Sequence, residues 1–372
     1  MPNRPAVKPA SLGIVAVVLA AVALGLLAIL GIDRTGERGG GLSEAFDYQI
    51  EAYKAIDPAL IRYEPTGEIQ AGMSEARAVA VGPEDRVYVC GDRAIRVCEA
   101  DGTPRKEIPL DGSPRCLAVV AGEGSGFRVQ GSAVEEPSSE PDRQPPTLLY
   151  VGVDRRVEVL GEDGKPVARW DELDEKAVLT SIAVGEEHVF VADAGNRVVL
   201  KYDPAGQIVD RIGAIDSRRG SRGFAIPSPF FDVAVDRSGL LWVVNPGALR
   251  LECYSPDGDL ERFWGKQSAA VEGFFGCCNP AHFALLPDGR FVTAEKGLLR
   301  VKVYDADGRF ECVVAGPEQL EAPGRASEGA LWDHEFKAVD VAADGQGRIL
   351  VLNPARGVVQ IFRPKQAETE AE

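Results

Sequence analysis

The chain has 372 residues, enough for one large domain or two ordinary ones, and its hydrophobic content of 45% is ordinary for a globular core. A formal net charge of −16 argues against a nucleic-acid partner, because binding to phosphates requires a positive surface. The sequence also contains no G-x-S-x-G elbow, phosphate-binding loop, H-E-x-x-H motif or dinucleotide fingerprint.

The first predicted element is a membrane-spanning helix. No charged residue occurs from Leu12 to Ile32, and at about 1.5 Å per residue this run would span about 31 Å, which matches the hydrocarbon core of a bilayer. Arg4 and Lys8 precede the run, whereas the charges after it offset one another. The positive-inside rule therefore predicts a cytoplasmic N-terminus and an extracytoplasmic, periplasmic body. A cleaved signal peptide is the alternative, but its apolar region is usually shorter. We therefore expect residues 1–35 to form a cytoplasmic stub and a signal anchor, single-pass, in the inner or plasma membrane.

A linker is predicted over residues 36–59. Its glycines 39–41 form a flexible joint. Ser43 can then cap the N-terminus of a short helix that runs through Ala55. This segment connects the predicted anchor to the main body.

From residue 75 onward, the same pattern of short apolar runs and Gly-containing turns recurs six times. The clearest copies are Asp232–Gly258 and His282–Gly308. Short strands repeated in this way bury their apolar faces only by stacking on neighbouring units. Four strands per unit and six units therefore predict an all-β, six-bladed β-propeller over residues 60–364, with a disordered acidic tail at 365–372. The innermost strands are predicted to begin near Ala78, Cys116, Ser181, Asp232, His282 and Asp340.

The two ends of the repeat region are predicted to meet. The last unit ends after its third strand, whereas Ile61–Ile69 resembles the third-to-fourth strand segment Leu200–Ile208. The N-terminal copy can therefore supply the missing outer strand and cover an exposed edge. A flexible insertion is predicted at about 128–147, where Glu, Pro, Ser and Gly dominate.

Two segments carry a resemblance to a known repeat. Pro229-Phe-Phe-Asp-Val-Ala-Val-Asp236 and Val189-Phe-Val-Ala-Asp-Ala-Gly-Asn-Arg-Val198 resemble NHL repeats. The resemblance covers about residues 60–364, and the chain is similar in particular to bacterial six-bladed NHL proteins tethered to the membrane. The resemblance implies the propeller fold. NHL proteins include binding scaffolds, sensors and a metal-dependent lyase, so the resemblance implies no single activity.

The start of each inner strand is a candidate site, because equivalent positions of a propeller form a ring around the central channel. Asp232, His282 and Asp340 come from three consecutive units, and Cys116 occupies the same position in the second unit. These four residues are candidate ligand-binding residues at the channel mouth. Two carboxylates and an imidazole suit a divalent metal ion or acid–base chemistry. The structural alternative is that the aspartates cap turns or bond to the neighbouring blade. With three histidines in the whole chain, the multi-histidine metal site of the related lyase is not reproduced.

The second candidate site is the motif Gly273–Phe283, which contains Cys277, Cys278 and His282. Thiolates and an imidazole favour zinc or copper. A disulfide between adjacent cysteines would be strained and easily reduced, which is typical of redox-active bonds. In the third interpretation the pair only shapes a tight loop. The remaining cysteines fall in or at the ends of predicted strands and are expected to be buried: Cys90, Cys98, Cys253 and Cys312.

Three functions remain open from the sequence. The first is a membrane-tethered module that binds or scaffolds a protein partner at the membrane, or a small ligand, through the channel rim. The second is a metal-dependent lyase or hydrolase that uses Asp232, His282 and Asp340. The third is a redox or metal-handling accessory protein that uses Cys277 and Cys278. No motif in the sequence demands catalysis, so the binding module is preferred.

Overall fold

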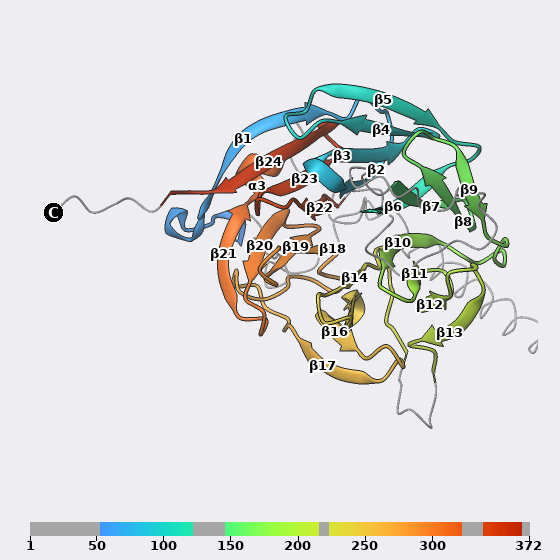
Figure 1. Cartoon of the computed structure of the whole chain (residues 1–372). Coiled ribbons are helices and arrows are strands. Elements are labelled where there is room, and N and C mark those ends of the chain that lie inside the picture. Colours follow the sequence, from blue (N-terminus) through green and yellow to red (C-terminus); the bar gives the residue numbers. More distant parts are fainter. Residues whose placement is uncertain (1–52, 122–145, 216–222, 322–337, 367–372) are drawn as a thin grey trace, which may run out of the picture. The chain divides into compact units, whose positions relative to one another are not determined.

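The computed structural model describes residues 53–121, 146–215, 223–321 and 338–366. Within these ranges, 24 strands form six antiparallel sheets of four strands each. The sheets surround a central axis, with the first strand of each blade innermost and the last at the periphery (Figure 1). The predicted all-β, six-bladed propeller is confirmed.

The first three blades follow one another along the chain. Blade 1 consists of β2 (Ala76–Val81), β3 (Val87–Gly91), β4 (Ala94–Cys98) and β5 (Pro104–Pro109). Blade 2 consists of β6 (Pro114–Ala121), β7 (Thr147–Val153), β8 (Arg156–Gly161) and β9 (Pro166–Arg169). Blade 3 consists of β10 (Leu179–Val184), β11 (Val189–Asp193), β12 (Val198–Tyr202) and β13 (Ile208–Ile212).

The next two blades repeat this order, and the sixth takes its outer strand from the N-terminal side. Blade 4 consists of β14 (Val233–Val235), β15 (Leu241–Asn245), β16 (Arg250–Tyr254) and β17 (Leu260–Trp264). Blade 5 consists of β18 (His282–Leu285), β19 (Phe291–Glu295), β20 (Arg300–Tyr304) and β21 (Phe310–Ala315). Blade 6 consists of β22 (Asp340–Ala343), β23 (Ile349–Asn353), β24 (Val358–Pro364) and β1 (Tyr63–Gln70).

The sixth blade closes the ring as predicted. Strand β1 pairs antiparallel with β24, from Tyr63 opposite Pro364 to Gln70 opposite Val358. The N-terminal strand therefore covers the edge that the last unit would otherwise expose. Four short helices lie outside the blades: η2 (Pro58–Leu60), η3 (Pro83–Asp85), η4 (Pro246–Ala248) and α3 (Pro317–Leu320); Tyr53 and Lys54, at the start of the described residues, are also helical.

The core lies in the gaps between blades. The described residues form six apolar clusters, and each combines residues from two adjacent blades. In one of them, Val292 and Val303 of blade 5 pack with Val341 and Val351 of blade 6. A strand in the middle of a blade is therefore covered on both faces, which explains why all five residues of β19 are buried. The β-branched residues of these strands suit such packing.

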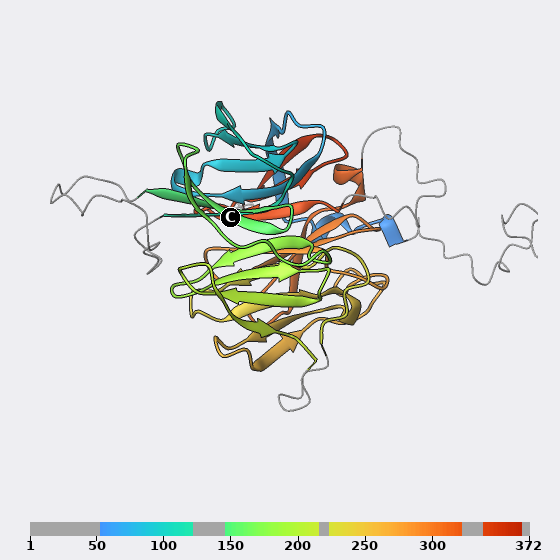
Figure 2. The ribbon, with the colours of Figure 1, turned by 90° about the vertical axis from the view of Figure 1, so that its right-hand side faces the viewer.

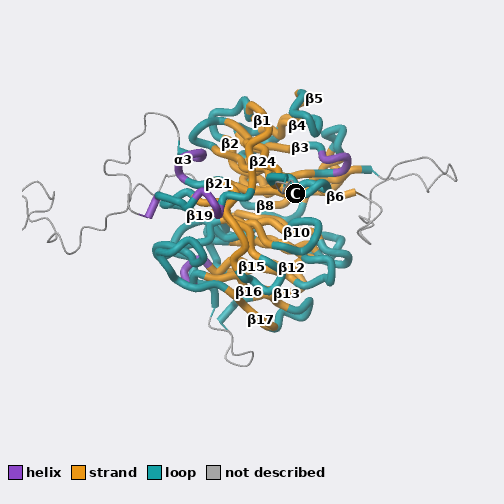
Figure 3. Tube along the Cα trace, turned by 90° about the vertical axis from the view of Figure 1, so that its left-hand side faces the viewer, coloured by secondary structure: helices purple, strands orange, loops and turns teal. Residues whose placement is uncertain are grey.

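The antiparallel order gives the ring two different faces. Each inner strand begins, and each second strand ends, at the face that carries the connections between blades; we call it the connection face. The opposite face carries the turns between the first and second strands and between the third and fourth; we call it the turn face. Figures 2 and 3 show the ring from the side, with strands making up most of its body.

Several predicted segments fall outside the described residues: the anchor at 1–35, most of the linker at 36–59, the insertion at about 128–147 except its last two residues, and nearly all of the tail at 365–372. In the part of the chain that the structure describes, no helix is long and apolar enough to cross a membrane.

Candidate functional site

Three residues from consecutive blades meet at the start of the inner strands. His282 is the first residue of β18, Asp340 is the first of β22, and Asp232 immediately precedes β14. The His282 Nδ1 atom lies 3.4 Å from Asp232 Oδ2 and 3.4 Å from Asp340 Oδ1. One potential ligand atom from each of the three lies within 4.8 Å of the others, and in the described ranges no other cluster of three His, Cys, Asp or Glu does so. The ring geometry expected from the repeats thus brings these side chains together.

The two carboxylates also tie blades to one another. Asp232 Oδ2 accepts a hydrogen bond from the backbone N–H of Phe283 in blade 5, at 2.9 Å. Asp340 Oδ2 accepts one from Val79 in blade 1, at 2.8 Å. The second oxygen of each carboxylate accepts from the next residue of its own strand. The aspartates therefore do bond to the neighbouring blades, as the structural alternative from the sequence predicts. Each carboxylate oxygen keeps one further lone pair for His282 or a cation.

Burial sets the electrostatics of this cluster. It raises the pKa of Asp340 to about 6, although His282 opposes the shift and Asp232 adds to it. Burial lowers the pKa of His282, but Asp340 and Asp232 outweigh that effect, and the net pKa is raised above its usual value. The arrangement therefore favours a positive charge at its centre, which an imidazolium or a bound divalent cation would supply.

Cys116 does not join this cluster. Its side chain is buried in the apolar layer between blades 2 and 3. A Cβ atom at Gly152 would lie 2.5 Å from the Cys116 sulfur, so the thiol fills a space on the neighbouring strand. Burial raises the pKa of Cys116 well above its usual value, which keeps it a neutral packing group.

The polar ends of the second strands have a repeated structural role. Each side chain hydrogen-bonds to the connection that enters its own blade, as when Asp193 accepts from Val178 N–H and Asn245 accepts from Ala225 N–H. The Glu295 carboxylate likewise accepts a hydrogen bond from the backbone N–H of Phe275, at 2.7 Å. These residues fix the connections that lie on the connection face.

The connection from β17 to β18, residues 265–281, carries both adjacent cysteines, and we call it the Cys loop. The Lys302 ammonium donates to the carbonyl oxygens of Val271 (3.1 Å) and Gly273 (2.6 Å), and it forms a 2.8 Å ion pair with Glu295. Both charged side chains are fully buried. Asn279 adds a third anchor, because its amide donates to the carbonyl oxygens of Phe275 and Lys296. The backbone of the Cys loop is thus held at several points.

The two thiols stay accessible on this fixed loop. Cys277 is exposed, Cys278 is partly buried, and their sulfur atoms lie 3.5 Å apart as free thiols. Gly276 precedes them with a φ of +83°, the left-handed conformation that glycine adopts most easily. The pair does not join His282 in a three-ligand group within the described residues.

Sequence reasoning did not find the residues around the cysteines. The Lys296 ammonium donates to the Ser228 hydroxyl at 2.7 Å and lies 4.8 Å from the centre of the Phe230 ring, and Lys296 helps to lower the pKa of Cys278. The Phe230 ring meets the His282 imidazole edge-to-face, with centroids 5.6 Å apart. Phe230 thus bridges the Cys loop surroundings and the Asp232–His282–Asp340 cluster.

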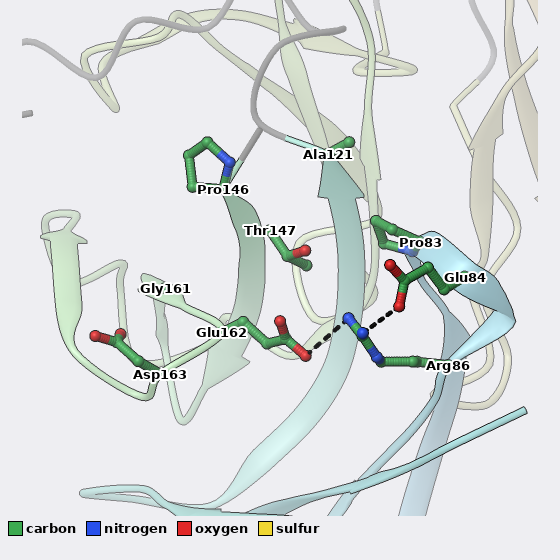
Figure 4. Close-up of a pocket in the computed structure, with 9 residues that line it drawn as sticks. All are labelled: Pro83, Glu84, Arg86, Ala121, Pro146, Thr147, Gly161, Glu162 and Asp163. Atoms are coloured by element: carbon green, nitrogen blue, oxygen red, sulfur yellow. Dashed lines mark hydrogen bonds and ion pairs between the residues drawn. The ribbon is translucent and has the colours of Figure 1, made fainter. Parts of the chain in front are cut away.

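A separate cavity of about 600 Å³ opens on the turn face between blades 1 and 2. Arg86 lies in it between Glu84 and Glu162, with its Nη1 3.5 Å from a Glu162 carboxylate oxygen (Figure 4). The main charged side chains that line this cavity are already paired with one another. The cavity lies at the turn-face ends of the inner strands, whereas the Asp232–His282–Asp340 cluster lies at their connection-face ends.

Comparison with known proteins shows similarity at the level of the fold. A streptogramin B lyase structure superposes with a TM-score of 0.51 at 12% identity, covering 83% of this chain and 100% of that chain. Virginiamycin B lyase from Staphylococcus aureus gives a TM-score of 0.49 at 12% identity, covering 81% and 99%. A protein of unknown function from Bacteroides caccae gives 0.47 at 13% identity, covering 66% and 83%.

The chain shares the propeller fold. No protein-family model matches it, and no curated protein does either, so the NHL identity stays a prediction. Identities of 12–13% carry nothing beyond the fold, so only the site itself bears on the function.

Proposed function

We propose that this chain is a membrane-tethered, extracytoplasmic propeller of the NHL type that binds a protein or a small ligand on its connection face. The observation that carries the proposal is the Cys loop, which buried polar groups hold in place while Cys277 and Cys278 remain accessible beside the channel mouth. A surface that is already fixed before binding loses little conformational entropy when a partner docks. The mixture of thiol, ammonium and aromatic groups there suits recognition.

The contacts of the first described residues support the same face. The ring of Tyr53, near the start of the described chain, lies 5.9 Å from the ring of Phe275 in the Cys loop. The Arg300 guanidinium donates to the Tyr53 carbonyl oxygen, and Lys54 forms a 3.0 Å ion pair with Glu321. We therefore infer that the chain after the predicted anchor reaches the propeller beside the Cys loop, on the face proposed for binding.

Site-specific photocrosslinking in intact membranes tests this proposal. A photoreactive amino acid at position 277 is expected to yield discrete protein or ligand adducts. The same amino acid at position 163, an exposed site on the turn face, is the matched control and is expected to yield none of them. Identical adducts from both positions, or none from position 277, would contradict the proposal. Deletion of residues 1–35 is expected to release the protein from the membrane fraction.

A second candidate function rests on the three-donor group at the channel mouth. Asp232, His282 and Asp340 would hold a divalent metal ion, whose contribution would be Lewis-acid activation of a bound substrate in a lyase or hydrolase. The carboxylates would keep their bonds to the neighbouring blades and use their remaining lone pairs. Elemental analysis of protein purified without chelator is expected to show one metal ion per chain, and its absence would leave the cluster as an inter-blade tie.

A further inference from the structure

The adjacent thiols differ from the other cysteines of the chain in accessibility. Five of the seven cysteines are buried, and only Cys277 and Cys278 reach the surface. Their sulfur atoms lie 3.5 Å apart on a loop whose backbone is anchored by Lys302, Glu295 and Asn279. An incoming reagent therefore meets a fixed pair of thiols.

The pair is poorly placed to close on itself. Adjacent Cα atoms lie about 3.8 Å apart, whereas disulfides usually need about 4.4–6.8 Å. A bond between Cys277 and Cys278 would consequently be strained and readily reduced. This geometry keeps both sulfurs available for reaction with another molecule.

The charges around the pair favour an anion over a cation. The Lys296 ammonium, which donates to the Ser228 hydroxyl at 2.7 Å, and that hydroxyl both act on the Cys278 thiol. Burial raises the pKa of Cys278, but Lys296, Cys277 and Ser228 together outweigh it and lower that pKa. The contact with Cys278 raises the pKa of Cys277. A positive charge beside the sulfur opposes a metal ion and stabilises a thiolate.

We propose that Cys278 and Cys277 form a thiol–disulfide exchange site on the connection face, which captures a disulfide-bearing partner through Cys278. This inference deepens the proposed binding function and rests on the same face. The Cys278 thiolate attacks one sulfur of the partner's disulfide, a bond forms between them, and the partner's other sulfur leaves as a thiolate. Release by Cys277 would require the strained adjacent disulfide, so the mixed disulfide persists until an external thiol displaces it.

The test uses the full-length protein in detergent and 5,5′-dithiobis(2-nitrobenzoate) as the disulfide probe. Wild type is expected to react rapidly at one thiol, with the adduct mapped to Cys278 by mass spectrometry. Cys278→Ser is expected to lose the fast phase, whereas Cys277→Ser still forms its adduct at Cys278, but more slowly because the neighbouring thiol no longer helps to lower the Cys278 pKa. Lys296→Ala is expected to slow the fast phase about tenfold at pH 7, because less thiolate is present. Lys165→Ala, an exposed lysine on the turn face, is the matched control and should react like wild type.

Retention of the fast phase in Cys278→Ser, or an unchanged rate in Lys296→Ala, would overturn the proposal. Misfolding of a variant is recognised separately, because it would expose the five buried thiols to the probe. The experiment is also independent of the crosslinking test. If the probe reacts at Cys278 but position 277 crosslinks nothing, the exchange chemistry is supported and the binding of a partner on this face is contradicted. If position 277 crosslinks a partner but the probe does not react at Cys278, binding is supported and the exchange chemistry is contradicted.

Discussion

The buried ion pair beneath the Cys loop gives the sharpest stability prediction. Lys302→Met removes the ammonium that pairs with Glu295 at 2.8 Å and that donates to the Val271 and Gly273 carbonyl oxygens. Because both charged side chains are fully buried, the variant leaves the Glu295 carboxylate in the core without its cation and with only the hydrogen bond from Phe275 N–H. Removing one partner of such a pair typically costs about 3–5 kcal/mol. We expect a loss of that size in the free energy of unfolding, measured by urea denaturation followed through tryptophan fluorescence.

Two further variants make this prediction refutable. Glu295→Gln combined with Lys302→Met removes both charges and keeps an oxygen that can accept from Phe275 N–H, so it should recover about half of the loss or more. Lys165→Met breaks an exposed ion pair of nearly the same length, 2.9 Å, with Asp163, and should leave the unfolding midpoint unchanged. A cost below about 1 kcal/mol for Lys302→Met, or a double variant no more stable than the single one, would refute the argument.

Three other predictions follow from the central cluster and the ring closure. The pKa of His282 is raised in the folded state. The contribution of His282 to the free energy of unfolding is therefore complete below about pH 6.5, the pKa of a histidine in the unfolded chain, and is lost as the pH rises through the pKa that His282 has in the folded protein. The stability difference between wild type and His282→Gln should therefore shrink from pH 6 to pH 9 in denaturant titrations, and a difference that grows would contradict the assignment. If a divalent cation binds there, Mn²⁺ should raise the melting temperature more at pH 8 than at pH 6, where it competes with a proton, and Asp340→Asn should abolish this shift. Ile69→Ala, at a buried position of β1, should cost about 2–5 kcal/mol in the same unfolding assay, and an unchanged midpoint would show that β1 is dispensable for closure.

The periodic features of this protein could be predicted from its sequence. Gly turns at constant spacing fix where each inner strand begins, so Asp232, His282 and Asp340 could be aligned without coordinates. The same alignment puts Cys116 opposite Gly152, as it puts His282 opposite Ala294. What the alignment could not show is that the Cys116 thiol is buried between blades 2 and 3 and does not join the three-residue cluster.

The non-periodic features could not be predicted. Lys296, Ser228 and Phe230 lie in turns and connections, where no repeat indicates which side chains meet. Lys302 alternates with valines in β20, a pattern that usually indicates a solvent-facing side chain. In a propeller, the middle strands are covered by blades on both sides, so the lysine is buried and needs Glu295 as a partner.

The pairing of β1 with β24 has a consequence for biosynthesis. The ribosome makes the strand at Tyr63–Gln70 early, but its partner at Val358–Pro364 appears only after five complete blades have been translated. Blades 1–5 can each form from neighbouring segments, whereas the sixth must wait for the longest loop closure in the molecule. During that wait the nascent chain holds an unpaired strand, and a prematurely terminated product would keep it permanently, as a template for association with other chains.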